Sequence, residues 1–303
     1  MALYLHVDRS TGQGATMDVA QMQAKLGPQW QDWLAENIAR GCRDEDLVRV
    51  MTGNGFEPAF ASCAVAVVGA MTARVRAQAP AALVPFANDP IRLPAGSRAM
   101  AHDREVGFGF VLRNPNIAVL ENLLDDGECE ELIRLSAGKL QRSEVVDREG
   151  GGFTVSDVRT SAGTYFARGE NTLVSLLEAR ISALTGVPVE HGEPLQILHY
   201  EHAGEYRPHH DYFDPSRPGS EEILAKGGQR IATLVIFLND VPGGGATEFP
   251  EIELTVMPRR GSGVYFEYCN GAGQIDARCL HAGRPVTAGE KWVVTKWLRQ
   301  RPY

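Results

Sequence analysis

The chain has 303 residues, of which 44% are hydrophobic and 22% charged, and its formal net charge at pH 7 is −8. This composition is typical of a globular protein of one or two domains, and it excludes a disordered, collagen-like or coiled-coil chain. The acidic balance argues against a nucleic-acid partner, because phosphate contacts need clustered Lys and Arg. No apolar run approaches the ~20 residues of a membrane helix, so we expect no membrane partner either.

The N-terminal segment and the cysteines both favour a cytoplasmic protein. Met1–Ser10 lacks the basic stretch followed by an apolar stretch that marks a secretory signal. The chain has five cysteines, an odd number, and none of them form a CxxC motif. We therefore expect free thiols in a reducing compartment.

Residues 1–83 are predicted to form a small all-α domain. Apolar residues recur at helical spacing over Asp18–Ile38, and Gly27-Pro28 divides this run into two helices. A third helix is expected to be capped by Asp44 and to end at Gly53. Pro58 suits the first turn of a fourth helix that runs to about Ala79.

Two further features concern this domain and the segment after it. Trp30 and Trp33 are expected to pack in its core, and an interaction surface is the alternative. Residues 84–104 contain Pro85, Pro90 and Pro94 among Gly, Ser and Asn, a composition typical of a semi-rigid linker.

Residues 105–303 are predicted to form an α+β domain rich in short strands. Asp125–Leu140 and Glu170–Thr185 have the pattern of amphipathic helices. The strands expected after them are Leu195–Tyr200, Glu205–Tyr212, Ile231–Leu238, Leu254–Met257, Gly263–Tyr268 and Lys291–Arg299. Many short strands with Gly- and Pro-rich turns favour a sandwich or jelly roll, with helices covering one sheet.

The segment Tyr206–Phe213 contains a metal-binding pattern. In a strand, residues two apart share a face, so His209 and Asp211 would point the same way and His210 the other way. His281 is the obvious third ligand from a distant strand. Two His and one carboxylate form the facial triad of non-haem Fe(II) oxygenases. A lone HxD occurs by chance in many chains, so ordinary polar residues remain the alternative.

Lys291 strengthens the metal prediction. It begins an alternating strand, and if its face is internal it is a buried cation, which is costly without an anion. A dicarboxylate cosubstrate would supply that anion. The alternative is that Lys291 faces solvent and Trp292 faces the core.

From about Asn116 to Tyr303 the chain resembles the 2-oxoglutarate- and Fe(II)-dependent prolyl 4-hydroxylases, the plant and algal type most closely. The motifs that carry the resemblance occur in a fixed order along the chain: Arg159-Thr160-Ser161, Glu193-Pro194-Leu195-Gln196, Tyr200, Pro208-His209-His210-Asp211, Gly227-Gly228-Gln229-Arg230, Gly243–Pro250, His281-Ala282-Gly283, Lys291-Trp292 and Lys296-Trp297-Leu298. Such a series is far more specific than any single motif.

The resemblance implies a double-stranded β-helix, a jelly roll with the metal between its sheets. It implies that Fe(II) is held by His209, Asp211 and His281. It implies cosubstrate contacts from Tyr200, Thr247, Lys291 and Trp297, with Lys291 pairing with the distal carboxylate of 2-oxoglutarate. The activity implied is hydroxylation of peptidyl proline at the 4-position, with O₂ consumed, succinate and CO₂ released, and ascorbate as reductant.

The resemblance also implies a peptide site. The positions that match its substrate contacts are Arg159, Ser161, Glu193, Tyr206 and Arg230. Structural ion pairs are the alternative for the two arginines. Gly-rich segments at Ser143–Asp157 and Asp214–Gly228 are expected to close over substrate, and ordinary surface loops are the alternative.

The chain departs from the family pattern at two positions. Arg299 stands where a histidine is common, and Ala246 stands where an acidic residue is usual. Neither change removes a metal ligand, but both leave the peptide preference open.

Two other functions compete with peptidyl-proline hydroxylation. One is the same chemistry on a free amino acid or a natural-product peptide. The other is an oxygen-responsive regulatory hydroxylase whose partner binds to residues 1–83. That domain is not part of the family core, and its expected roles are substrate recruitment, homodimerisation or packing against the barrel.

Overall fold

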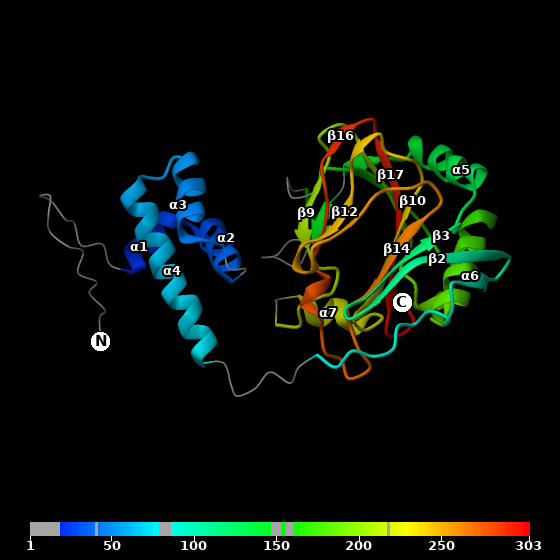
Figure 1. Ribbon diagram of the computed structural model, residues 1–303, viewed down its shortest axis with the longest axis horizontal. Helices are drawn as coiled ribbons and strands as arrows, with labels where there is room; N and C mark the ends of the chain where they lie inside the picture. The colour runs from blue at the N-terminus through cyan, green and yellow to red at the C-terminus, as the bar shows by residue number, and fades with distance from the viewer. Residues whose placement is uncertain are drawn as a thin grey trace, which may run out of the picture. The chain divides into compact units, whose positions relative to one another are not determined.

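The computed structural model describes residues 19–39, 42–78, 86–142, 144–146, 153–155, 160–216 and 219–303. The chain divides into two compact units, Met1–Pro85 and Phe86–Tyr303 (Figure 1). Among the described residues, no helix has the length and apolar character that crossing a bilayer requires.

The first unit is helical in its described part. Its helices are α1 Val19–Leu26, α2 Pro28–Ala39, α3 Asp44–Gly53 and α4 Pro58–Gln78. Gly27 has φ +75°, a conformation that glycine adopts readily, and it separates α1 from α2 as predicted. The prediction that Asp44 caps α3 was wrong. Arg43 is the cap residue and makes no side-chain cap bond, while Asp44 is the first helical residue, where its charge favours the positive end of the helix dipole.

The core of this unit is apolar, and both tryptophans lie at its margin. Leu34 and Met51 are fully buried, whereas Trp30 and Trp33 are half-buried and pack against the core. The ring of Trp30 stands edge-on to Trp33 and to Phe56, with centroids 5.1 and 4.9 Å apart. The two side chains therefore pack as predicted and still leave part of their surface exposed.

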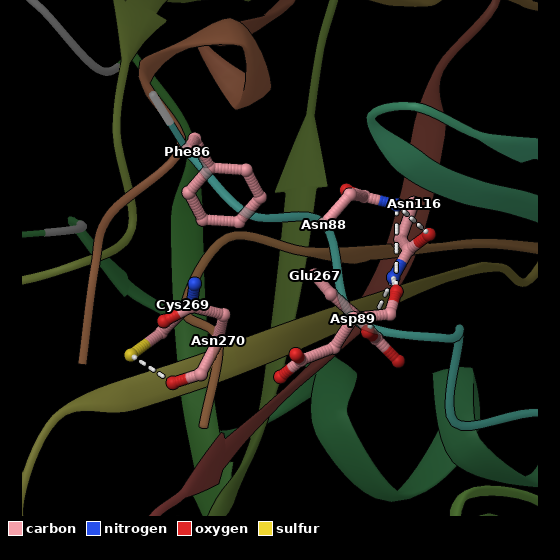
Figure 2. A pocket seen from close by; sticks show the side chains of 7 residues that line it. All are labelled: Phe86, Asn88, Asp89, Asn116, Glu267, Cys269 and Asn270. Atoms are coloured by element: carbon pink, nitrogen blue, oxygen red, sulfur yellow. Dashed lines mark hydrogen bonds between the residues drawn. The ribbon is translucent and has the colours of Figure 1, made fainter. Parts of the chain in front are cut away.

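The described part of the expected linker belongs to the second unit, and residues 98–101 form strand β1. Asn116 donates through Nδ2 to the carbonyl of Asp89 and to Glu267, at 2.9 Å each. Figure 2 shows these side chains around the small pocket that Phe86 and Asn88 also line. Partly buried hydrogen bonds from Asn88, Asp89 and Arg92 therefore join the described part of this segment to the second unit.

The second unit consists of helices around two antiparallel sheets. Its helices are α5 Asp126–Ala137, α6 Thr172–Thr185 and α7 Ser220–Ala225, with 3₁₀ turns at Val189–His191, Pro250–Ile252 and Ala277–Cys279. Its strands are β1 Arg98–Ala101, β2 Arg104–Arg113, β3 Asn116–Glu121, β4 Gln141–Arg142, β5 Glu144–Val146, β6 Phe153–Val155, β7 Ala162–Phe166, β8 Leu195–Tyr200, β9 Tyr206–His209, β10 Arg230–Phe237, β11 Gly243–Gly244, β12 Thr247–Phe249, β13 Leu254–Val256, β14 Gly263–Glu267, β15 His281–Gly283, β16 Val286–Ala288 and β17 Lys291–Arg299.

The sheets form the predicted double-stranded β-helix. The larger sheet has the order β1-β2-β3-β14-β10-β17-β8-β7-β4, and the smaller one has the order β13-β12-β15-β9. The pairs β11–β16 and β5–β6 are separate. The β5–β6 pair falls within the expected closing segment 143–157, whose remaining residues lie outside the described part of the chain. Helix α7 falls within the second expected closing segment, 214–228.

Two apolar cores flank the larger sheet. One contains residues of α5 and α6 and the helix-facing residues of the sheet, such as Leu234 and Val294. The other lies between the two sheets and contains Tyr200, Phe237 and Val293. Because each face of the larger sheet packs against a core, side chains of β8, β10 and β17 are buried in both directions.

Candidate active site

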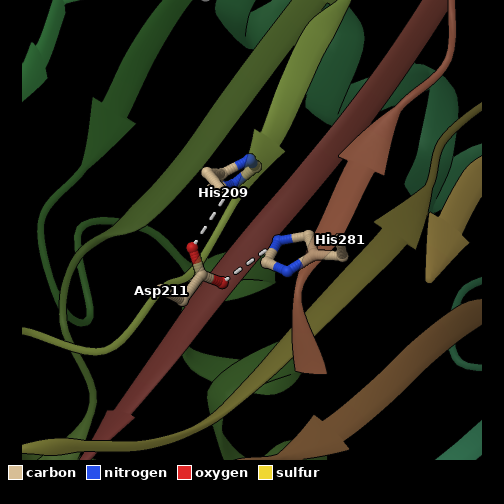
Figure 3. Close-up of side chains that lie close together, drawn as sticks. All are labelled: His209, Asp211 and His281. Carbon is tan, nitrogen blue, oxygen red and sulfur yellow. Dashed lines mark ion pairs between the residues drawn. The ribbon is translucent and has the colours of Figure 1, made fainter. Parts of the chain in front are cut away.

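Three side chains meet between the two sheets. His209 ends β9 and His281 begins β15, and the two residues are direct partners across these strands. Asp211 lies with Oδ1 3.6 Å from Nε2 of His209 and Oδ2 3.6 Å from Nε2 of His281 (Figure 3). One ligand atom from each residue lies within 4.8 Å of the others, which is compatible with a shared metal ion.

The convergence of the three residues was predicted, but the reason given for it was wrong. Strand β9 ends at His209, so Asp211 lies beyond the strand and does not share a strand face with the histidine. The backbone turns after His209, and Arg230 donates through Nη1 to the carbonyl oxygen of Asp211 at 3.3 Å. This contact from β10 helps to hold the carboxylate side chain in the site.

The hydrogen bonds prepare both imidazoles for metal binding. Nδ1 of His209 lies 2.9 Å from the carbonyl oxygen of Arg207, and Nδ1 of His281 lies 3.1 Å from that of Cys279. A carbonyl oxygen only accepts, so we assign the proton of each ring to Nδ1. Each Nε2 then presents a lone pair to the site, which is the arrangement common in metal-binding histidines.

Asp211 is ionised at neutral pH. Burial acts to raise its pKa, but His281, His209 and Arg230, together with a hydrogen bond from Thr233, lower it overall to about 2. Two imidazoles and one carboxylate fit Fe(II), because they form the facial set of non-haem oxygenases and leave other coordination positions for cosubstrate and O₂.

The triad opens into a pocket between the two sheets. Its lining includes the triad, the four residues expected to bind cosubstrate and one expected substrate contact: His209, Asp211 and His281; Tyr200, Thr247, Lys291 and Trp297; and Tyr206. The structure therefore places the predicted metal and cosubstrate residues around one cavity.

Lys291 is buried in this pocket without an anion. It is 4% exposed, and it has no ion pair or hydrogen bond with any residue that the structure describes. Burial lowers the pKa of Lys291 to about 8. The alternative was correct that Trp292 faces the core, on the helix side of the sheet, but wrong that Lys291 faces solvent, because Lys291 is itself buried. An unpaired buried ammonium fits the carboxylate of a ligand.

The other cosubstrate candidates lie beside it. Tyr200 of β8 is the direct strand partner of Lys291 on β17. Thr247 is buried on β12 of the smaller sheet. The indole Nε1 of Trp297 is buried with no hydrogen-bond acceptor in the described part of the chain, so it has a donor to offer a ligand.

The expected substrate contacts divide into three groups. Tyr206 stacks on the ring of His209, with centroids 3.5 Å apart. Arg230 forms the alternative ion pair, because its Nε and Nη2 each lie 2.7 Å from a carboxylate oxygen of Glu193. Ser161 is fully buried, and Arg159 lies outside the described residues.

Arg230 nevertheless remains at the pocket. Its guanidinium group lies 4.0 Å from the ring centroid of Trp297, which lines the cavity. The same carboxylate of Glu193 accepts a hydrogen bond from Arg299 at 2.8 Å. Arg299, the residue that departs from the family pattern, is therefore a buried partner of an expected substrate contact.

Sequence reasoning missed Thr233 and Tyr268, which lie behind Asp211. Thr233 donates to Oδ2 of Asp211 at 2.7 Å, and the Tyr268 hydroxyl lies 3.0 Å from that threonine oxygen. The available signal was a lone hydroxyl residue in the otherwise apolar run Ile231–Leu238.

Comparison with known proteins agrees with this site. Residues 195–299 match the 2OG-Fe(II) oxygenase superfamily. Prolyl 4-hydroxylase 5 of Arabidopsis thaliana is 39% identical over 204 residues, which cover 61% of this chain and 68% of the plant protein. The chain belongs to the 2-oxoglutarate- and Fe(II)-dependent prolyl 4-hydroxylase family. Prolyl 4-hydroxylase 2 of the same plant is 38% identical over 62% of this chain and 68% of its own length.

A solved structure also resembles this prolyl 4-hydroxylase family member. The viral collagen prolyl hydroxylase of Paramecium bursaria Chlorella virus-1 in its 2OG complex aligns with a TM-score of 0.47 and 24% identity, over 60% of this chain and 95% of the viral one. The enzyme is a 2-oxoglutarate-dependent dioxygenase, because family membership and the composition of its own pocket point to the same chemistry.

Proposed function

We propose that this enzyme hydroxylates C4 of a proline residue in a peptide or protein, with 2-oxoglutarate and O₂ converted to succinate and CO₂. One observation carries the proposal: the His209–Asp211–His281 triad shares a pocket with Lys291, a buried cation that has no anion among the described residues. A metal with open positions and a cation for a distal carboxylate are the two requirements for using 2-oxoglutarate.

Fe(II) held by the triad would supply the oxidising chemistry with O₂. The protein's own residues bind and orient the reactants. Lys291 neutralises the distal carboxylate of 2-oxoglutarate, and the hydroxyls of Tyr200 and Thr247 donate to the same end. Trp297 closes the side of the pocket and excludes water from it.

The peptide site is proposed to lie at the mouth of this pocket. Tyr206 against His209 and Arg230 against Trp297 offer flat surfaces and a donor. A polyproline II peptide exposes flat rings and free carbonyls, which match such a surface. We extend the site to Arg159 and Ser161 and keep Glu193 as the residue that orients Arg230. Ascorbate is the proposed reductant.

The test follows two products together. The protein is incubated with Fe(II), 2-oxoglutarate, ascorbate, O₂ and a panel of proline-rich peptides, and succinate and peptide mass are measured. The expected result is a gain of one oxygen on proline with one succinate formed, and His209→Ala abolishes both. Succinate without peptide oxidation would overturn the peptide substrate and favour a small molecule. No succinate after verified Fe(II) loading would overturn the oxygenase assignment.

We propose further that the helical unit recruits a protein substrate in the cytoplasm. The half-buried Trp30 and Trp33 support a contact surface, and the five free thiols support a reducing compartment. Trp30→Ala/Trp33→Ala variants should hydroxylate short peptides normally and lose preference for the protein substrate. Light scattering of the same variants would reveal homodimerisation as the competing role, and cell fractionation tests the compartment.

A further inference from the structure

The carboxylate of Asp211 is held by a chain of hydroxyl groups from the opposite sheet. Thr233 lies on β10 of the larger sheet, whereas the metal ligands His209 and His281 lie on β9 and β15 of the smaller sheet. The Thr233 side chain is fully buried, and its hydroxyl oxygen lies 2.7 Å from Oδ2 of Asp211. Val235, two residues along the same strand, lines the pocket, so Thr233 is on the pocket-facing side of β10.

The direction of this hydrogen-bond chain follows from proton counting. A threonine hydroxyl has one proton, and Thr233 gives it to Asp211. The Tyr268 hydroxyl, 3.0 Å away, must then be the donor to the threonine oxygen. Burial raises the pKa of Tyr268 well above its usual value, so the phenol keeps the proton that it donates.

We propose that Thr233, supported by Tyr268, is a positioning residue that fixes the orientation of the Asp211 carboxylate and thereby raises the affinity of the site for its divalent metal. A carboxylate on a turn can rotate about its terminal bond. The hydroxyl chain selects one rotation, in which Oδ1 faces His209 and Oδ2 faces His281. This inference rests on the metal site in the proposed function but not on the identity of the substrate.

The packing around the chain supports a positioning role. Tyr268 is 1% exposed, and its ring packs near Phe266 and Tyr212, with centroids 5.9 and 6.2 Å away. Arg230 fixes the backbone of Asp211 through its carbonyl oxygen, so β10 holds both the main chain and the side chain of this ligand. Hydrogen-bonded partners of metal ligands typically change metal affinity 10–100-fold when they are removed.

The experiment measures binding of Mn(II) to the metal-free protein by calorimetry or by electron paramagnetic resonance of free Mn(II). Thr233→Val keeps the shape and removes the hydroxyl, and we expect Kd to rise about 10–100-fold. Thr233→Ser keeps the hydroxyl and should stay within about threefold of the unchanged protein. Tyr268→Phe should weaken binding less than Thr233→Val does, because Tyr268 acts through the threonine.

Two further variants separate positioning from folding. Thr233→Val leaves the Tyr268 hydroxyl buried without an acceptor, which costs stability, and adding Tyr268→Phe removes that donor. The double variant should therefore regain stability but keep the weak Mn(II) binding of Thr233→Val. Thr185→Val, in helix α6, is the control for loss of another buried threonine hydroxyl and should bind Mn(II) normally.

The proposal is overturned if Thr233→Val binds Mn(II) within twofold of the unchanged protein, or if the double variant regains affinity together with stability. The second result would mean that the threonine acts only through the fold. Because no substrate or turnover enters the measurement, failure of the proline-hydroxylation assay would leave this test intact.

Discussion

Two lysines of strand β17 are both buried, and only one of them has an ion-pair partner among the residues that the structure describes. Lys291 is 4% exposed and Lys296 is 2% exposed. They lie an odd number of positions apart and so face opposite sides of the sheet. Lys296 meets Glu178 of helix α6 at 2.6 Å, whereas Lys291 faces the pocket with no anion among the described residues.

The comparison distinguishes a structural cation from a binding one. A buried ammonium that meets a carboxylate within the fold is part of the packing between sheet and helix. One that lacks such a carboxylate, and lines a cavity, is compensated only when a ligand binds. The two lysines should therefore respond in opposite ways to the same substitution.

Lys296→Met should give the larger effect on stability. It leaves Glu178 buried and without its cation, and we expect the free energy of unfolding to fall by about 3–5 kcal/mol. Urea denaturation at pH 7 measures this loss. Adding Glu178→Leu removes the orphaned charge and should restore most of the stability. A fall below about 1 kcal/mol for the single variant would contradict the structural role.

Lys291→Met should weaken ligand binding and leave stability unchanged. Removal of an unpaired buried cation should not lower the free energy of unfolding, whereas the Kd for 2-oxoglutarate should rise about 100- to 1000-fold. Calorimetry with Mn(II) in place of Fe(II) measures the Kd. Lys296→Met, taken at a temperature where it is folded, is the matched control and should bind 2-oxoglutarate within about threefold. Equal losses of affinity in both variants would contradict the assignment of Lys291 as the ligand-binding lysine and of Lys296 as the structural one.

The sequence indicated the residues of the candidate site more accurately than it indicated the bounds of the strands on which they lie. The bounds of β8 and β17 agree with the prediction, because both strands are long and mostly apolar. Strands such as β1, β12 and β16 were missed. Each has only three or four residues, and their pairing depends on partners distant in the sequence.

Only part of the candidate site could be predicted from the sequence, because some of its residues gain a role only through contacts made in the fold. The metal ligands and Lys291 are titratable residues within short, recognisable motifs, so the sequence alone reveals them. Thr233 becomes meaningful only when the two sheets bring it to Asp211. Likewise, Asn88 and Asp89 resemble linker residues until Asn116 provides their hydrogen bonds.

The pKa of Lys291 gives the comparison a pH dependence. Without a bound ligand, the Lys291 side chain in the folded protein has a pKa of about 8. An anion bound beside it favours the protonated form. Above pH 8, binding of 2-oxoglutarate must therefore include uptake of a proton, so its affinity should fall by up to about tenfold per pH unit. Below pH 8 the affinity should be nearly constant with respect to this group.

Calorimetry between pH 6.5 and 9.5 in buffers of different ionisation enthalpy measures both the affinity and the proton uptake. Lys291→Arg is the control, because a guanidinium stays charged over this range and its affinity should not follow the same curve. A flat profile for the unchanged protein would mean that Lys291 does not meet the charge of the ligand.

The smallest expected effect tests whether burial, and not position in the sequence, makes Lys291 important. Glu290 immediately precedes it and pairs with His199 at 2.6 Å, but the glutamate side chain is 57% exposed. Exposed pairs contribute roughly 0–1 kcal/mol because water screens them. Glu290→Gln should therefore change the free energy of unfolding by less than about 1 kcal/mol and the Kd for 2-oxoglutarate by less than about twofold. A tenfold gain in affinity would instead show that an exposed charge acts on the pocket through the sheet, and the contrast between the lysines would then depend on long-range charge as well as on contact.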